Sequence, residues 1–547
     1  MSPSWADGIS LGAIVSGFFI HNMFFIKGEW HIQAPLIFRF YIALFLLNLG
    51  VYYWIIEQRF EWCLTYTIFT LCFHLIGLFG SMFLYRVWFH PLKRFPGPFL
   101  AKVSKLWHVW KVRDSQNYLF LESLRQQYGD FVRTGPNEIT TFHPDGLNAI
   151  HRTEYATRSG WYDLLYPSLS VATVRDPDLH DKRRRVWEPA FTVTAMKDHE
   201  EQIREHALKV ISTIQESGGD EVNMNLVVYQ FANNVMRDLA FSQSSDHNDQ
   251  EWQRSVNTLH IGISILGPLT PAPWIAILAS SFAFLPLVRD WNKLMSYCES
   301  KITERISMPA PERRDISAWL IENAEIRGAT ESSEEKRWLV GDAFAAILAG
   351  FDTTASTLIF AFFYLAKYPE YQARVYDEIK TADVKLSTLN SRDFQKLPFL
   401  NAFIDETLRL HHPQPSSGSK ILRENGLTIG DTFIPGGVEV SAPRWSFGRQ
   451  EAHYKRCWEF LPERWLNDSD LVNDRRAFTP WGIGKWSCLG KQVALFELRY
   501  LITAIIYNYI VSFPLGDDGS RVEKDYKDQV TAFPGQLSLN FHNRHSL

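Results

Sequence analysis

Residues 477–494 read AFTPWGIGKWSCLGKQVA and place one cysteine, Cys488, between a glycine-rich turn and a predicted helix. Unpaired backbone N–H groups at a helix N-terminus favour a thiolate over a thiol, so this position suits a sulfur that binds a metal. Gly484 and Gly490 allow a tight turn and the close approach of a flat ligand, and Trp481 is placed to exclude water. The stretch therefore predicts a metal-binding thiolate, with a buried structural cysteine as the alternative.

The length and composition set broad limits on the fold and point to an apolar portion. The 547 residues suffice for several domains or for one large catalytic domain. Residues are 46% hydrophobic and 14% aromatic, which excludes a disordered chain and favours a membrane segment or an apolar cavity. The net charge of -4 gives no support for nucleic-acid binding. Five scattered cysteines argue against a disulfide framework and for a reducing compartment.

Three apolar segments open the chain, at residues 9–26, 36–56 and 62–88. Each is near or above the ~20 residues that a membrane-spanning helix needs. The first lacks the basic start and the cleavage site of a signal peptide, so we expect retained spans. His21 and Asn22 weaken this segment, which leaves two spans as the alternative to three. Basic residues after the first and third segments predict a lumenal N-terminus and a body that faces the cytosol.

A proline-rich stretch, YRVWFHPLKRFPGP at residues 85–98, follows the apolar segments. Pro96 and Pro98 predict a stiff, extended linker, although an ordinary turn is equally compatible with the pattern. We therefore predict a membrane anchor over residues 1–90 and a separate domain over residues 91–547.

A fourth apolar stretch, residues 259–288, contains four prolines that interrupt any continuous span. A fourth transmembrane span is therefore not expected there. Residues 338–368 predict a long helix, but Asp352, Thr353 and Thr354 lie at its centre, and acidic groups are costly in lipid. The pattern favours a buried central helix of a soluble domain.

Several of these stretches resemble motifs of the cytochrome P-450 family, the haem-thiolate monooxygenases. The loop around Cys488 is similar to F-x-x-G-x-R-x-C-x-G, although Trp481 and Trp486 replace the phenylalanine and the basic residue. AGFDTT at 349–354 is similar to [AG]-G-x-[DE]-T-T, and residues 405–410 (DETLRL) contain E-x-x-R. The segment P-E-R-W then follows in the family's order, and the resemblance extends from residue 85 to the C-terminus.

The resemblance implies a mainly α fold with a minor β part, preceded by the transmembrane helices. It implies haem b as cofactor, bound through Cys488 as the iron ligand. Asp352 and Thr353 would relay protons as the catalytic pair, for which local capping and backbone bonding are the alternative. The remaining residues carried over are Arg184, His180, Lys420 (or Arg423) and Lys485 at the haem propionates; Trp481, Gly484 and Gly490 in the cysteine loop; and a structural network of Glu406, Arg409 and Arg464.

The implied reaction inserts one oxygen atom from O2 into a lipophilic small molecule, by hydroxylation, epoxidation or multistep oxidation. Fungal secondary metabolism is the expected setting, with a terpenoid, polyketide or prenylated alkaloid as substrate. No dinucleotide fingerprint is visible, so electrons from NADPH would arrive through a membrane-bound flavoprotein reductase in the endoplasmic reticulum. The expected docking residues are Lys485, Lys491, Arg475 and Arg476, and the expected pocket residues are Phe344, Ala345, Ala349, Ser416 to Ser419, Ala532 and Phe533.

Two other functions remain open at this stage. A haem-thiolate isomerase or dehydratase would use no O2, and a non-catalytic membrane haem-binding protein would leave Asp352 and Thr353 without a role. A requirement for NADPH during turnover separates the monooxygenase from both.

Overall fold

The computed structural model describes residues 3–56, 59–152, 155–242, 250–308, 313–326, 333–383, 385–416, 418–466 and 469–544. The described part is mainly helical, as expected. Its helices are α1 (Pro3–Ile20), α2 (Ala34–Ile56), α3 (Phe60–Leu84), α4 (Phe99–Val103), α5 (Lys105–Lys111), α6 (Asn117–Tyr128), α7 (Gly146–Arg152), α8 (Pro177–Trp187), α9 (Val193–Glu216), α10 (Met224–Phe241), α11 (Gln250–Leu269), α12 (Trp274–Ser280), α13 (Pro286–Ser307), α14 (Ile316–Ile326), α15 (Ser333–Lys367), α16 (Pro369–Thr381), α17 (Pro398–Leu410), α18 (Arg444–Phe447), α19 (Lys491–Asn508) and α20 (Arg521–Lys524).

The strands form four small sheets in the described residues. One sheet has five strands in the order β1-β2-β8-β5-β3, and the others are β4-β12-β9, β10-β11 and β6-β7. The strands are β1 (Phe131–Gly135), β2 (Glu138–Thr141), β3 (Ala156–Arg158), β4 (Val222–Asn223), β5 (Lys420–Leu422), β6 (Leu427–Ile429), β7 (Thr432–Ile434), β8 (Glu439–Ser441), β9 (Tyr509–Ser512), β10 (Lys527–Gln529), β11 (Thr531–Phe533) and β12 (Ser538–Asn543).

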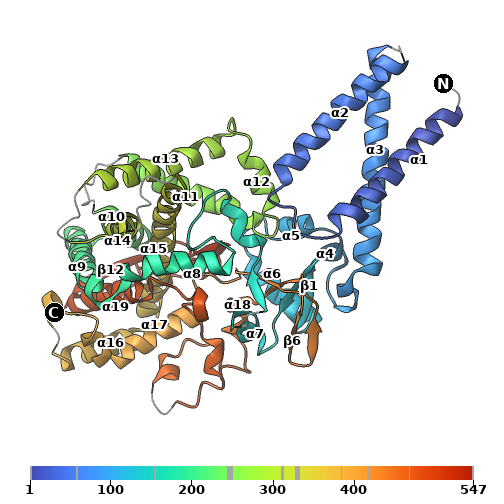
Figure 1. Ribbon diagram of the computed structural model, residues 1–547. Helices are drawn as coiled ribbons and strands as arrows, with labels where there is room; N and C mark the ends of the chain where they lie inside the picture. Colours follow the sequence, from blue (N-terminus) through green and yellow to red (C-terminus); the bar gives the residue numbers. More distant parts are fainter. Residues whose placement is uncertain are drawn as a thin grey trace.

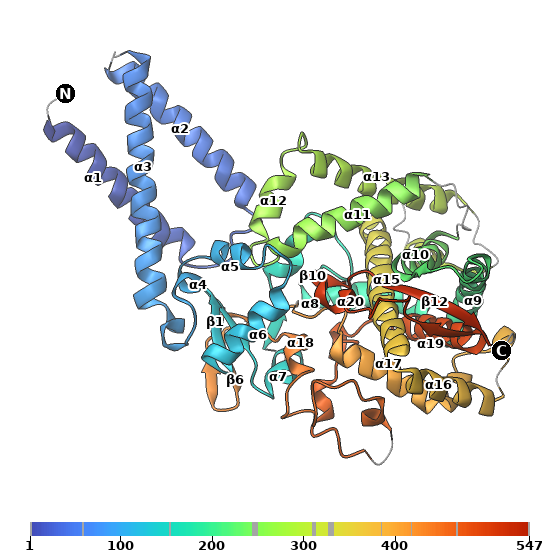
Figure 2. The ribbon, with the colours of Figure 1, turned by 180° about the vertical axis from the view of Figure 1, so that it is seen from behind.

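Helices α1, α2 and α3 project together from one end of the molecule (Figures 1 and 2). Their apolar stretches, Gly8–Phe25, Ala34–Trp54 and Phe60–Phe89, are long enough to cross a membrane, close to the three segments expected from the sequence. Helix α15 is also long and apolar, but most of it is buried. Figures 1 and 2 show it running through the middle of the globular part.

Polar residues of α1 and of the π-helical turn that follows it, His21–Phe25, are paired with α3. His21 Nδ1 lies 2.8 Å from Ser81 Oγ, and Ser16 Oγ lies 2.8 Å from His74 Nδ1. The two backbones touch at Gly17, where an added Cβ would come within 2.0 Å of the His74 carbonyl oxygen. Small residues and hydrogen bonds between helices are the usual means of packing helices in a membrane. They explain why His21 and Asn22 do not interrupt the first apolar helix.

The proline-rich stretch is packed against the domain rather than free. The Arg133 N–H donates to the Pro96 carbonyl at 2.7 Å, and Phe95 is buried. A Cβ at Gly97, whose φ is +152°, would lie 2.5 Å from the Arg133 carbonyl oxygen. The linker therefore fixes the anchor to strand β1.

The core forms where α15 packs against α10 and α19. Gly350 of α15 allows the close contact with α10, because a Cβ there would lie 2.2 Å from Met236 Sδ. Residues 259–288 form the end of α11, all of α12 and the start of α13, so no continuous span forms there. Residues 416–443 contain β5 to β8, in line with the small β part expected.

Candidate active site

The cysteine loop ends directly before α19. Helix α19 begins at Lys491 with Gly490 as its N-cap, and the Cys488 N–H donates to the Trp481 carbonyl at 2.7 Å. Gly482 and Gly484 have φ of +74° and +64°, which residues with side chains rarely adopt. These backbone constraints hold the Cys488 side chain just ahead of the helix.

The Cys488 side chain is accessible although it lies deep inside the fold. Burial raises the pKa of its thiol, whereas the Gly490 N–H and the charges of Arg184 and Lys491 act in the opposite direction. A metal ion would have to displace the proton for the sulfur to bind as a thiolate.

The basic run at residues 182–185 contacts both sides of the site. Arg183 is buried and pairs with Asp342 and Glu335 of α15. Arg184 points the other way, and its Nη1 donates to the Ser487 carbonyl at 2.7 Å and to the Lys485 carbonyl at 3.1 Å. Helix α8 thereby joins the central helix to the cysteine loop. A propionate contact for Arg184 stays a prediction.

Trp486 stands where the family motif has a basic residue, and its ring lies among cations from other parts of the chain. Its ring is 4.1 Å from the Arg158 guanidinium carbon and 4.7 Å from Lys420 Nζ. The ring of His180 lies 4.0 Å away, centroid to centroid. Arg158 was missed by the sequence analysis because it belongs to no motif, and only the pairing of β3 with β5 brings it beside Lys420. Arg423, the alternative to Lys420, is exposed.

The haem that the family resemblance implies fits this cluster. Arg158 and Lys420 are buried, and neither forms an ion pair with a carboxylate in the described part of the chain. Burial and the charges of Arg158, Arg444 and Lys485 lower the pKa of Lys420 to about 7. Buried cations require an anionic partner, and a haem carries two propionate carboxylates. Arg158, Lys420 and His180 would hold these carboxylates, with Cys488 as the iron ligand.

Lys485 lies at the edge of the cluster. It is partly exposed, and its Nζ lies 3.3 Å from Asp181 Oδ2. Its charge is thus already partnered within the chain, and its role at a propionate stays a prediction.

In the middle of α15, Ala349 is exposed, and Leu348, Gly350 and Thr353 are partly exposed. Ala349 and Thr353 lie four residues apart on one helix face. The Thr353 hydroxyl donates to the Ala349 carbonyl at 2.7 Å, which is the local backbone bond considered as the alternative. Its oxygen can still accept a hydrogen bond.

Asp352 points away from Thr353. Its Oδ2 accepts a hydrogen bond from the Thr531 hydroxyl of β11, and the Tyr229 phenol of α10 is close to the same carboxyl. Burial raises the pKa of Asp352 to about 6, while Thr531 and Tyr229 partly oppose this shift. The carboxyl can therefore hold or release a proton near neutral pH.

A second buried acid, Glu497 of α19, was not anticipated. Its Oε2 accepts from the Thr354 hydroxyl at 3.1 Å, and burial raises its pKa to about 8 despite this bond. It links α19 to α15 on the side of the cysteine loop. The one signal in the sequence is an acid between apolar residues in VALFEL, residues 493–498.

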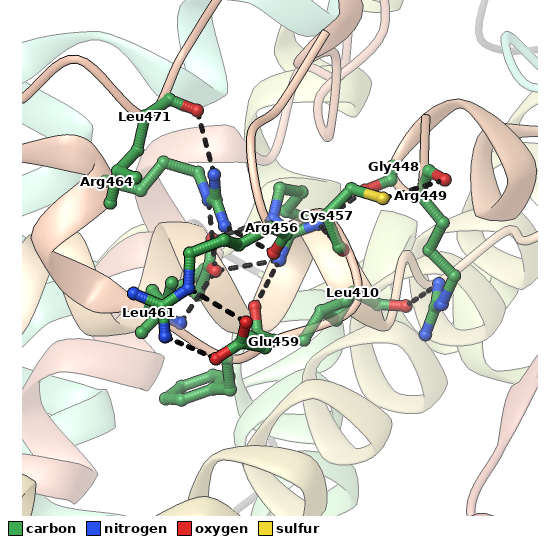
Figure 3. A network of polar contacts seen from close by, with 12 residues as sticks. Leu410, Gly448, Arg449, Arg456, Cys457, Glu459, Leu461, Arg464 and Leu471 are labelled. Carbon is green, nitrogen blue, oxygen red and sulfur yellow. Dashed lines mark hydrogen bonds and ion pairs between the residues drawn. The ribbon is translucent and has the colours of Figure 1, made fainter. Parts of the chain in front are cut away.

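Glu406, Arg409 and Arg464 are brought together in a fully buried network. Both Glu406 oxygens accept from Arg409 at 2.8 Å, and Arg464 Nε lies 3.2 Å from Glu406 Oε1. Figure 3 shows the surrounding network, in which Arg464 reaches the Leu471 carbonyl at 2.9 Å. The two arginines also bind further carbonyls of residues 448–459. The network therefore fixes the irregular segment that leads to the cysteine loop.

The expected pocket residues are scattered. Phe344 packs on Trp291, and Phe533 stacks on Tyr229. Ser416 and Ser419 line a separate cavity of about 540 Å³. Ser417 lies outside the described residues.

Known proteins match nearly the whole chain. Residues 96–539 match the family model described as Cytochrome P450. Cytochrome P450 monooxygenase notG' of Aspergillus versicolor is 32% identical over 531 residues, 94% of either chain. Tryprostatin B 6-hydroxylase of Neosartorya fischeri is 34% identical over 459 residues, 82% of either chain. Cytochrome P450 monooxygenase phqL of Penicillium fellutanum is 30% identical, covering 97% of this chain and 94% of its own.

These matches bear out the fold class and the reaction class that the motifs predicted. The family implies haem iron, O2, a substrate and a redox partner. Since the family model covers most of the chain and relatives above 30% identity cover nearly all of it, this chain belongs to the cytochrome P450 family of haem-thiolate monooxygenases.

Proposed function

We propose that this monooxygenase oxidises a lipophilic secondary metabolite, of terpenoid, polyketide or prenylated alkaloid type, from within the endoplasmic reticulum membrane. The names of relatives support the setting, since one is a tryprostatin B 6-hydroxylase. The three apolar N-terminal helices support membrane attachment. In this arrangement the catalytic part faces the cytosol.

The observation that carries the proposal is the accessibility of three residues inside a buried core. Cys488 is exposed ahead of α19, while Ala349 and Thr353 are accessible on α15. A bound haem supplies O2 activation and the transfer of one oxygen atom. The protein supplies the sulfur ligand, two small or polar positions on α15, and apolar walls that hold a substrate carbon.

Proton movement falls to side chains of α15 and α19. Asp352, with a pKa of about 6, exchanges a proton at its carboxyl near neutral pH. Thr353 can accept a hydrogen bond at its hydroxyl oxygen. Glu497, whose pKa is about 8, stays protonated at neutral pH and accepts from Thr354.

Electrons from NADPH are proposed to enter through a flavoprotein reductase that docks beside the cysteine loop. Lys491 and Arg475 form the basic part of this surface, since Lys485 and Arg476 are already paired with Asp181 and with Asp474 and Asp145. Charge reversal at Lys491 should slow reduction in a salt-dependent manner. Unchanged reduction kinetics would contradict this docking surface.

The decisive experiment is carbon monoxide binding to the reduced full-length protein. A thiolate-ligated haem gives a characteristic red-shifted Soret band, and Cys488→Ser should abolish it. Cys298→Ala, at a buried cysteine that faces the hydrophobic core, serves as the matched control and should keep the band. If Cys488→Ser retained the band, the proposed ligand would be wrong.

A second experiment separates oxygen insertion from the alternatives. Turnover in the presence of a reductase should consume NADPH and place one oxygen atom from labelled O2 in the product. Product formation without NADPH or O2 would instead indicate an isomerase or dehydratase.

A further inference from the structure

A cavity of about 540 Å³ lies where the membrane anchor meets the catalytic body. The anchor contributes Trp30 and His31 from the loop after the first span, and Phe79 and Met82 from α3. The body contributes walls from α5, α12, β2 and β8, and from the loop after α17. In Figures 1 and 2, the lower end of α2 lies beside α12, and the lower ends of α1 and α3 lie beside α4 and α5.

Four charged or ionisable side chains fasten the anchor loop, residues 27–33, to the body. His31 Nε2 lies 2.7 Å from Asp163 Oδ2, and the same oxygen accepts from Arg175 Nη1 at 2.6 Å. Arg175 also pairs with Glu29 of the loop. We call this network of Glu29, His31, Asp163 and Arg175 the anchor latch. Glu29 and His31 belong to the anchor. Asp163 and Arg175 belong to the body and lie more than 130 residues further along the chain.

The loop is in close contact with the body at Gly160. A Cβ at Gly160 would lie 2.7 Å from His31 Cε1 and 3.1 Å from Glu29 Oε1. The ring of Phe38, near the start of α2, lies 5.7 Å from the ring of Phe282, just after α12. The anchor is thus docked on the body through polar and aromatic contacts, beyond the covalent link at residues 91–98.

The cavity lies between membrane-facing residues and the hairpin that contacts the central helix. Its lining includes Phe79 and Met82, which belong to an apolar span, and Val530, which precedes Thr531. Thr531 in turn donates to Asp352 of α15. Asp528 and Ser416 line the same cavity and are hydrogen-bonded to each other. A lipophilic molecule leaving the bilayer between the spans would therefore meet this cavity before the central helix.

We infer that the anchor loop is a wall of the passage by which the lipophilic substrate travels between membrane and active site, and that the anchor latch keeps this wall closed. The anchor then controls substrate exchange as well as attachment. The inference rests on the proposed lipophilic substrate. It goes further in assigning a specificity role to Glu29, Trp30 and His31.

The test follows ligand exchange in the full-length holoprotein in lipid nanodiscs. Imidazole and 1-dodecylimidazole both bind ferric haem through nitrogen and shift its Soret band, but only the second is long and lipophilic. In Glu29→Gln and His31→Ala the association and dissociation rates of 1-dodecylimidazole should rise by about 5-fold, because the partly exposed latch pairs are lost. The rates for imidazole should stay within about 2-fold.

Gly160→Ala tests the same wall from the other side. Its Cβ would displace the His31 ring, so it should speed exchange of 1-dodecylimidazole in the wild-type background but have little further effect in His31→Ala. Glu205→Gln, on α9 at the far end from the anchor, is the matched control, since it removes one of the two partly exposed ion pairs of Arg313. It should leave both probes unchanged.

Hydrogen exchange supplies a readout that does not depend on turnover. Amides of residues 27–33 should exchange faster in the latch variants, and 1-dodecylimidazole but not imidazole should protect them in the wild type. The inference would be overturned if the latch variants changed the exchange rates of imidazole and 1-dodecylimidazole equally. It would also be overturned if these rates were unchanged and 1-dodecylimidazole did not protect the amides of residues 27–33. A failure of the haem-thiolate assignment would appear separately, as the loss of the carbon monoxide band in the wild type.

Discussion

The Asp352 carboxylate accepts a hydrogen bond from the Thr531 hydroxyl, so the acid at the centre of α15 is tied to the β10–β11 hairpin near the C-terminus. Val530, at the tip of this hairpin, lines the cavity below the anchor loop. A ligand that shifts the hairpin would therefore change the hydrogen bonding of Asp352. We therefore expect the position of the hairpin and the protonation of Asp352 to depend on each other.

Thr531→Val should raise the pKa of Asp352 above its present value of about 6. Valine cannot donate, so the carboxylate loses a bond that lowers its pKa, while burial continues to raise it. The measurement is the pH midpoint of the protonated carboxyl band in infrared difference spectra, identified by its absence in Asp352→Asn. Thr531→Ser keeps the hydroxyl and should keep the midpoint. An unchanged midpoint in Thr531→Val would show that the bond does not control the acid.

Gly350→Ala should destabilise the protein by about 1–3 kcal/mol, the usual cost of overpacking a core. The added Cβ would lie 2.2 Å from Met236 Sδ, and Met236 is buried between α10 and α15. Urea unfolding followed by circular dichroism measures the loss. In a Met236→Ala background the same substitution should cost less, because the clashing sulfur is gone. Equal costs in both backgrounds would place the strain elsewhere.

Glu406→Ala should destabilise by about 3–5 kcal/mol, because it leaves Arg409 and Arg464 buried without their carboxylate. Lys455→Ala is the control in the same region, since its pair with Asp470 is exposed and contributes little to stability. Thermal unfolding and the yield of haem-containing protein report both effects. Similar losses in the two variants would argue against a special role for the buried network.

Lys420→Met should raise the rate of haem loss by about 10-fold, because a haem propionate would lose its buried cationic partner. Lys485→Met should change it little, because Lys485 is partly exposed and already paired with Asp181. Transfer of haem to apomyoglobin measures both rates. A larger increase in haem loss for Lys485→Met than for Lys420→Met would indicate that Lys485, and not Lys420, is the propionate partner.

Local patterns in the sequence were sufficient to predict the membrane anchor and the elements around the site. Helical periodicity and the motifs predicted α15 from residue 338 rather than from Ser333, and placed the cysteine turn directly before a helix. The lengths of the apolar runs predicted the three stretches Gly8–Phe25, Ala34–Trp54 and Phe60–Phe89 within about two residues. These features depend on neighbours in the chain, such as the glycines at 482 and 484, so their causes are visible in the sequence. The family and the reaction class followed from the order of the motifs.

Long-range contacts were not predictable in the same way. The basic run did not reveal that Arg183 faces α15 while Arg184 faces the cysteine loop, since one residue turns a helix by about 100 degrees and the partners lie far along the chain. Arg158, Glu497 and the anchor latch belong to no motif. Their roles arise only when residues more than one hundred positions apart are packed together.

The sequence by itself determined that the protein has a cysteine-bound haem fold behind an apolar anchor, because helix periodicity, turn glycines and motif spacing act over short distances. Tertiary structure alone decided which cations surround Trp486, where the Asp352 carboxyl points and how the anchor loop closes a cavity. Those choices depend on burial and on charges from separate elements, and both quantities exist only once the chain has folded.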